Sequence, residues 1–125
     1  MLPPVDSFAR RTVAPGEVIF LEGQPADVAY VILKGEAQVT TRGAGGEEIV
    51  INRMTPGQMF GEVAILQPSG VRTATTISEQ GCELVVVERS FFDSSLNKAD
   101  PLLRFVVDHL CKRLTALTVL VAQKS

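Results

Sequence analysis

Cysteine and histidine are scarce in this chain of 125 residues, and their scarcity argues against several kinds of chemistry. The two cysteines, Cys82 and Cys111, fall in different predicted elements and lack the spacing of a metal site, so we expect two reduced thiols. The single histidine, His109, has no serine or cysteine that forms a convincing nucleophile set with it. A metal site would need further ligands at suitable spacing. We therefore expect no enzyme activity, no metal ion and no cofactor.

Excess charge and long apolar runs are also missing. The chain has 12 Lys and Arg against 14 Asp and Glu, a net charge of −2, and no basic cluster, which argues against a nucleic-acid surface. No apolar run could span a bilayer, and residues 1–4 lack a signal-peptide pattern, so we expect a cytoplasmic protein without a membrane partner. The length and the 46% hydrophobic content fit one domain, residues 1–125.

Short segments rich in β-branched residues, separated by glycine and proline turns, make up most of the chain before residue 89. Strands are expected at residues 7–13, 17–21, 30–33, 36–41, 47–54, 72–78 and 83–88. Short strands at regular intervals are typical of a β-barrel or sandwich. The fold class is therefore expected to be mainly β.

The hydrophobic period changes to that of helices at residue 89. Residues 89–96 predict a short helix with Phe91 and Phe92 as core anchors. A longer helix follows, with Asp100 as N-cap and Pro101 at the first helical position, and by its pattern it runs to about residue 123.

The long helix carries an apolar stripe with alternating spacings of four and three. Its members are Leu103, Val107, Leu110, Leu114, Leu117 and Val121. Such a stripe can pack on the barrel of its own chain or form the seam of a two-helix dimer. Because Val106, Val119 and Leu120 widen the apolar surface, we expect both contacts at once, and hence a homodimer through this helix.

Residues 60–76, here called the cassette, contain the most specific pattern in the chain. An apolar residue, a glycine, a carboxylate and a short run of helix formers precede a Pro-Ser-Gly turn, an arginine and a β-branched strand. Gly61 lets the backbone approach a ligand, and the first helical turn offers unpaired N–H groups to an anion. Arg72 can hold a phosphate with two charged hydrogen bonds, and ionised Glu62 can accept from a sugar hydroxyl. The pattern predicts a pocket for a sugar phosphate.

The sequence Phe60-Gly61-Glu62-Val63-Ala64 followed by Arg72-Thr73-Ala74 resembles the phosphate-binding cassette of cyclic-nucleotide-binding domains. The ten positions from Glu62 to Arg72 are similar to the spacing in bacterial catabolite-activator-type sensors. The resemblance covers roughly residues 15–114. It implies a double-stranded β-helix jelly roll at about residues 7–88, with a short cassette helix, and C-terminal helices at about residues 89–123.

The resemblance also implies individual roles at the ligand. Arg72 would bind the exocyclic oxygens of a cyclic phosphate, and Glu62 the ribose 2′-hydroxyl. The Thr73 hydroxyl could touch the phosphate or bond the 2-amino group of a guanine. The implied ligand-binding residues are Gly61, Glu62, Val63, Ala64, Arg72, Thr73 and Ala74.

Further residues are implied near the base. Ile51 and Met54 would form a wall for the purine. On the long helix, Arg113 resembles a residue near the phosphate, and Thr118 a hydroxyl that reaches the adenine of a partner subunit. Leu117 stands where the family has a hydroxyl residue. For these three helix positions, a solvated or core-packed role is the alternative.

Three functions follow as competing hypotheses. The first is a sensor module that binds a cyclic nucleotide, cAMP before cGMP, moves its C-terminal helix, and passes that movement to a partner or an effector domain. The second is a cupin-type enzyme, which would need a His/Glu metal cluster that one helical histidine cannot supply. The third is a degenerate barrel that serves only for dimerisation or docking, which the intact Glu62 and Arg72 disfavour.

Overall fold

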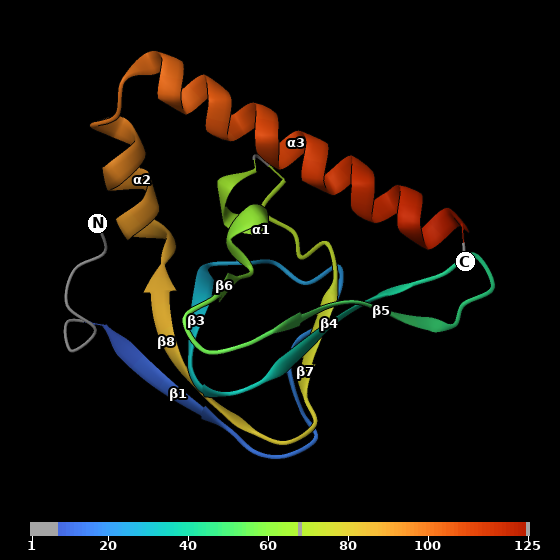
Figure 1. The fold of residues 1–125 in the computed structure, drawn as a ribbon. Coiled ribbons are helices and arrows are strands. Elements are labelled where there is room, and N and C mark those ends of the chain that lie inside the picture. The colour runs from blue at the N-terminus through green and yellow to red at the C-terminus, as the bar shows by residue number, and fades with distance from the viewer. Residues whose placement is uncertain (1–7, 68, 125) are drawn as a thin grey trace.

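The computed structural model describes residues 8–67 and 69–124, which fold into two antiparallel sheets with helices at one end (Figure 1). One sheet has the strand order β1-β8-β3-β6 and the other the order β2-β7-β4-β5. The strands are β1 (Ala9–Val13), β2 (Glu17–Phe20), β3 (Val28–Gly35), β4 (Ala37–Arg42), β5 (Glu48–Met54), β6 (Met59–Phe60), β7 (Thr75–Ser78) and β8 (Cys82–Glu88). The predicted mainly β jelly roll is confirmed.

The two sheets enclose an apolar core. Ile32 and Leu84 are 1% and 0% exposed, and burying a side chain of this size contributes about 1.5–3 kcal/mol. The rings of Tyr30 and Phe60 stack with centroids 5.4 Å apart. The Tyr30 hydroxyl accepts a hydrogen bond from Arg11 Nη1 at 3.0 Å, so this buried aromatic residue keeps a polar partner.

The strand predicted at residues 72–78 begins three residues later, at Thr75. The backbone of Arg72 pairs instead with the loop after β2: Arg72 N donates to Gln24 O at 2.8 Å, and Gly23 N donates to Arg72 O at 2.9 Å. The prediction for Arg72 was wrong because this loop, distant in sequence, takes its backbone hydrogen bonds. Strand β6, which pairs with β3 through two residues, was not predicted.

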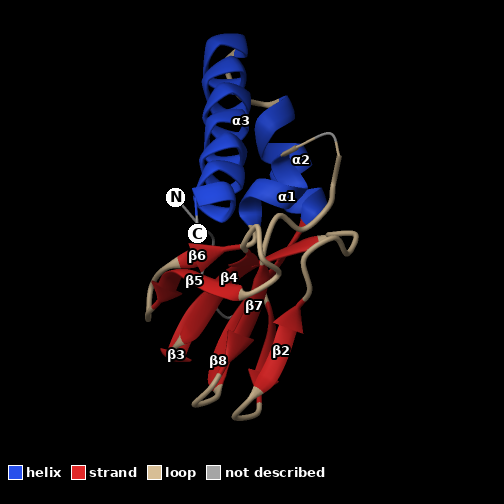
Figure 2. Cartoon of the chain, turned by 90° about the vertical axis from the view of Figure 1, so that its right-hand side faces the viewer, coloured by secondary structure: helices blue, strands red, loops and turns tan. Residues whose placement is uncertain are grey.

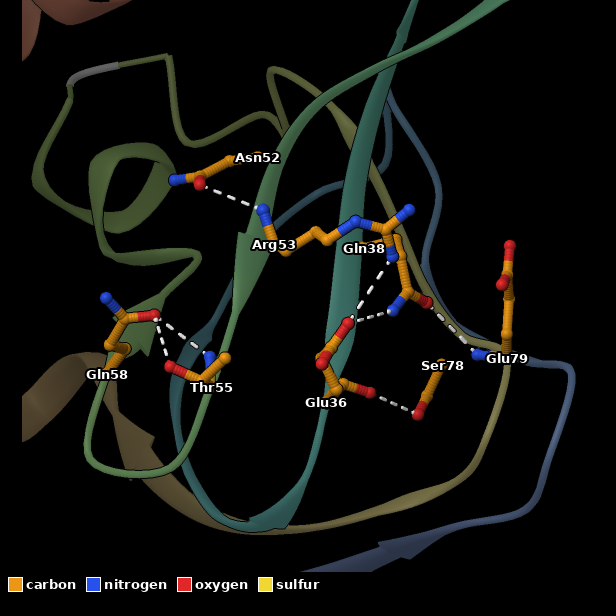
Figure 3. A network of polar contacts seen from close by, with 8 residues as sticks. All are labelled: Glu36, Gln38, Asn52, Arg53, Thr55, Gln58, Ser78 and Glu79. Atoms are coloured by element: carbon orange, nitrogen blue, oxygen red, sulfur yellow. Dashed lines mark hydrogen bonds and ion pairs between the residues drawn. The ribbon is translucent and has the colours of Figure 1, made fainter.

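A polar network braces the sheet at the ends of β4, β5 and β7 (Figure 3). Gln38 is 2% exposed, and it donates from Nε2 to Glu36 Oε1 at 3.2 Å and accepts from Glu79 N at 3.1 Å. Ser78 Oγ donates to Glu36 O at 2.6 Å, and Arg53 forms an ion pair with the Glu36 carboxylate at 3.3 Å. Because the buried side chains of Gln38 and Ser78 have hydrogen-bond partners, the sheet can hold them away from water.

Two short helices cover one end of the sheets (Figure 2). Helix α1 (Glu62–Leu66) buries Ala64 and Ile65, and helix α2 (Arg89–Asn97) follows β8 directly. Phe92 of α2 is half-buried against the cluster that contains Ala64 and Ile65. Phe91 is also half-buried, with its ring edge-on to Phe8 at 5.6 Å. The two predicted anchors therefore pack without being fully buried.

Helix α3 (Pro101–Lys124) lies across α1 (Figure 1). Leu102 N donates to Asp100 Oδ1 at 2.8 Å, which confirms the predicted N-cap. Cys111 is buried, and its carbonyl accepts a hydrogen bond from Gln67 Nε2 at 2.9 Å, which joins the cassette to the helix.

The apolar stripe of α3 is only partly covered by its own chain. Leu103, Leu110, Leu114 and Leu117 remain 49–55% exposed, and Val107 is half-buried. The side chains of Val119, Leu120 and Val121 lie outside the described residues. The stripe therefore leaves a half-exposed apolar face on the helix.

Neither cysteine forms a disulfide, and both are buried. Burial raises the pKa of the Cys82 and Cys111 thiols, and the charge on Glu62 adds to the increase at Cys111. Within the described residues, no helix is long and apolar enough to cross a membrane.

Candidate functional site

A cavity of about 350 Å³ lies between the cassette, the sheet that contains β4 and β5, and helix α3. All seven predicted ligand-binding residues line it, and so do Ile51, Met54 and Leu117. Seven further residues line the cavity that were not predicted at the ligand: Phe20, Val39, Asn52, Met59, Phe60, Thr76 and Leu114. The fold thus brings the cassette, one strand wall and one face of the long helix to a single cavity.

Gly61 is required at the start of α1 for two reasons. Its φ of 80° lies in the left-handed region, which side chains other than glycine rarely adopt. A Cβ at this position would also lie 2.7 Å from Arg72 Nη1 and 3.3 Å from the Phe20 ring. The absence of a side chain therefore lets the arginine lie directly against the cassette backbone.

Arg72 is held in place by its own protein. Only 5% exposed, it donates from Nη1 to Gly61 O at 2.9 Å and from Nη2 to Val28 O at 2.7 Å. Its guanidinium lies 4.0 Å from the centre of the Phe20 ring, a cation–π contact. Its Nε is buried and has no hydrogen-bond partner in the described part of the chain. A buried guanidinium with a free donor is a preformed site for an anion.

The electrostatics at Arg72 also favour a bound anion. Burial lowers the pKa of the guanidinium, and the nearby positive charge of Arg89 lowers it further, while Tyr30 and Asp27 act in the opposite direction. A phosphate at this position would supply the negative charge that the buried cation lacks, so ligand binding would relieve part of the cost of burial.

Glu62 presents the second unsatisfied polar group. Its Oε2 is buried without a hydrogen-bond partner among the described residues, and burial raises the pKa of the carboxyl. A hydrogen bond within Glu62, to its own backbone, opposes the shift. A carboxylate oxygen that faces a cavity without a donor can accept from a ligand hydroxyl.

The remaining cassette residues shape the cavity wall. Ala64 and Ala74 are buried, whereas Val63 and Thr73 are half-buried. Thr76 is 0% exposed, and its hydroxyl has no partner within residues 8–67 and 69–124. The small side chains leave space, and the hydroxyl adds one more unused polar group to the wall.

The β5 wall combines apolar and polar side chains. Val39 pairs with Asn52 and Thr40 with Val50, so Ile51 is an extra residue in a β-bulge. Alternation places Asn52 on the same face as Met54, a signal in the sequence that could have identified it. The bulge explains why Ile51 and Asn52, adjacent in sequence, both line the cavity.

Helix α3 closes the cavity with Leu114 and Leu117. Arg113 is exposed and is not among the lining residues, so its predicted phosphate contact stays a prediction. The side chain of Thr118 lies outside the described residues. Within the described residues, no group of three or more His, Cys, Asp or Glu side chains could hold a metal ion.

Comparison with known proteins points to one family. Residues 10–99 match the family model described as the cyclic nucleotide-binding domain. A CRP-like cAMP-activated global transcriptional regulator from Mycobacterium tuberculosis is 42% identical over 80 residues, which are 62% of this chain and 33% of that protein.

Two solved structures with bound cyclic nucleotides are also similar to this chain. The cAMP-bound form of the EAL enzyme Bd1971 matches with a TM-score of 0.83 and 25% identity over 91% of this chain and 30% of that one. Its cGMP-bound form matches with a TM-score of 0.79 and 26% identity over 86% and 28%. The present chain spans about a third or less of each of these relatives.

Proposed function

Because the chain belongs to the family of cyclic-nucleotide-binding domains, we propose that it senses cAMP in the cavity beneath α3 and passes occupancy to that helix. One observation carries the proposal: the buried Arg72 guanidinium, with its unpartnered Nε, lies in the same cavity as the unsatisfied carboxylate of Glu62. A stable fold without a ligand has no use for two such groups, which disfavours a barrel that serves only for docking.

The ligand's parts are assigned by chemistry. The cyclic phosphate binds Arg72 and the backbone at Gly61, and the ribose 2′-hydroxyl donates to Glu62. The base extends toward Ile51 and Met54, with Leu117 above it. A charged hydrogen bond contributes about 1.5–3 kcal/mol, so two at Arg72 supply a good part of the roughly 8 kcal/mol of a micromolar ligand.

We rank cAMP before cGMP. The M. tuberculosis relative is described as cAMP-activated, while the Bd1971 structures include both a cAMP-bound and a cGMP-bound form. Thr73 favours the second candidate, cGMP, since this residue lines the cavity and its hydroxyl could accept a hydrogen bond from the guanine 2-amino group.

The output of binding is assigned to α3, which lines the cavity with Leu114 and Leu117 and carries an exposed stripe that a second copy can cover. We propose a cytoplasmic, non-catalytic regulator that forms a homodimer through this helix. Its effector is a partner or another domain. The chain spans only a third of the M. tuberculosis relative, so the activity of that whole protein is not assigned to it.

Calorimetric titration with cAMP and cGMP tests the proposal. Arg72→Ala should weaken binding of either ligand more than tenfold (about 1.4 kcal/mol), because it removes the charged phosphate contacts. It should also lower stability, since Gly61 O and Val28 O lose their donors at about 1–3 kcal/mol per buried group.

Titrations should therefore be run well below the melting temperature of the variant. Arg42→Ala, at an exposed position at the end of β4, is the matched control and should bind like the wild type. If the wild-type chain binds neither nucleotide at roughly millimolar concentration, the sensor assignment is wrong and the docking function takes its place.

A further inference from the structure

The aromatic ring of Phe20 lies against the guanidinium of Arg72, with Cζ of the arginine 4.0 Å from the centre of the ring. A β-bulge in β2 lets Ile19 enter the core while the next residue, Phe20, lines the cavity. The rings of Tyr30 and Phe60 lie beside the Phe20 ring, with centroids 6.3 and 6.1 Å away. These neighbours hold the ring in its position at the arginine.

The charge of Arg72 has no full counter-charge in the described part of the chain, where this residue forms no ion pair with a carboxylate. Its two acceptors, Gly61 O and Val28 O, carry only partial negative charge. Because the side chain is 5% exposed, water contributes little. The face of an aromatic ring is also partly negative and attracts a cation above it. The Phe20 ring therefore supplies part of the compensation that a buried cation needs.

A bound phosphate changes the effect of this ring. The phosphate brings a full negative charge to the guanidinium, so the attraction between the cation and the ring contributes less. The negative face of the ring also repels an anion close to it. The ring therefore stabilises the ligand-free protein more than the complex. An interaction that favours the ligand-free state lowers the affinity for the ligand.

We propose that Phe20 is an affinity-determining residue, whose ring compensates the charge of Arg72 in place of a phosphate and so weakens the binding of cyclic nucleotides. The inference rests on the proposed cyclic-nucleotide site and adds a residue that sets the strength of binding. Phe20 acts through Arg72 and is a positioning residue. Because the two carbonyl groups at Gly61 and Val28 still hold the guanidinium, a change in the charge of the ring leaves the arginine in place.

Fluorination of the Phe20 ring tests this role, because fluorine withdraws negative charge from the face of the ring and largely keeps its shape. Phenylalanine analogues with increasing numbers of ring fluorines would replace Phe20. Calorimetry should show the Kd for cAMP falling along the series, by about fivefold in total for pentafluorophenylalanine. The same analogue in place of Phe91, which packs edge-on against Phe8 and does not line the cavity, is the matched control and should leave the Kd unchanged.

Thermal melts without ligand provide a second test. Pentafluorophenylalanine at position 20 also changes the contacts with Tyr30 and Phe60, so its effect on Tm must be compared with its effect in Arg72→Met. In that background no cation lies against the ring, and the aromatic contacts are the same. The change in Tm caused by fluorination should be more negative by about 4 °C when Arg72 is present.

The outcomes separate this inference from the proposed function. A Kd for cAMP that stays constant or rises with fluorination would overturn the role of Phe20, and so would an equal change in Tm in both backgrounds. Either result with a wild type that binds cAMP leaves the cyclic-nucleotide site in place. A wild type that binds no cyclic nucleotide overturns the sensor assignment and, with it, the effect of Phe20 on affinity.

Discussion

Glu62→Gln should make the protein more stable at neutral pH while it weakens ligand binding. In the unliganded fold, the Glu62 carboxylate has a buried oxygen without a donor, and burial raises its pKa. A buried polar group without a partner costs about 1–3 kcal/mol, and because Glu62 is only partly buried, we expect a gain of about 1 kcal/mol, or about 4 °C in Tm.

The pH dependence gives the effect its signature. The folded state binds the Glu62 proton more tightly than the unfolded state does, so stability from this group is fully present below the ordinary pKa of 4.5. That stability is lost as the pH rises through the raised pKa of the folded protein. The difference in Tm between Glu62→Gln and the wild type should therefore be near zero in acid and grow toward neutral pH.

Thermal melts without ligand between about pH 4 and pH 8 would measure this difference. Glu79→Gln removes an exposed carboxyl of the same kind and serves as the control. Calorimetry should show weaker cAMP binding in Glu62→Gln, with a smaller loss than in Arg72→Ala, because a neutral amide still accepts from the ribose hydroxyl. A constant or negative Tm difference across this range would refute the reasoning.

Two further predictions concern the cassette backbone and the long helix. Gly61→Ala should weaken cAMP binding more than tenfold (about 1.4 kcal/mol) and lower Tm, because a Cβ there meets the Arg72 guanidinium and the φ of 80° disfavours a side chain. Normal affinity in a titration would contradict the requirement for glycine at this position. Leu114→Glu or Leu117→Glu should weaken self-association by placing like charges on the exposed stripe, as measured by sedimentation equilibrium, and a wild type that stays monomeric at high concentration with or without ligand would disprove the helix seam.

The local patterns that predicted this fold were the ones that need no distant partner. The Asp100-Pro101 start of α3 and the strand segments at residues 36–41 and 47–54 depend on neighbours in sequence, and the structure has α3, β4 and β5 within a residue of where they were expected. The cassette was found because its glycine, carboxylate and arginine carry separable chemistry. Strand β6 has only two residues, too few to show the alternating pattern of a strand.

The parts that were missed depend on contacts between distant segments. Arg72 leaves the predicted strand because the loop that contains Gln24 takes its backbone hydrogen bonds. The bulge at Ile51 shifts the register of β5, and no residue type in that strand predicts a bulge. Asn52 could have been predicted as a cavity-lining residue, since alternation from Met54 places it on the cavity side. The sequence does not reveal that its Oδ1 accepts a hydrogen bond from Arg53 N.

The two buried thiols allow local opening of the unmodified protein to be measured by their reaction with a thiol reagent. Cys111 lies on α3 beside the cassette, whereas Cys82 lies in β8, paired with Val13 and Gly35 in the sheet. A thiol reagent reaches the first when the helix lifts and the second only when strands separate. If both openings reclose faster than the reagent reacts, the ratio of the two modification rates gives the free-energy gap between helix lifting and sheet opening. Helix dynamics can thus be timed without introducing a label.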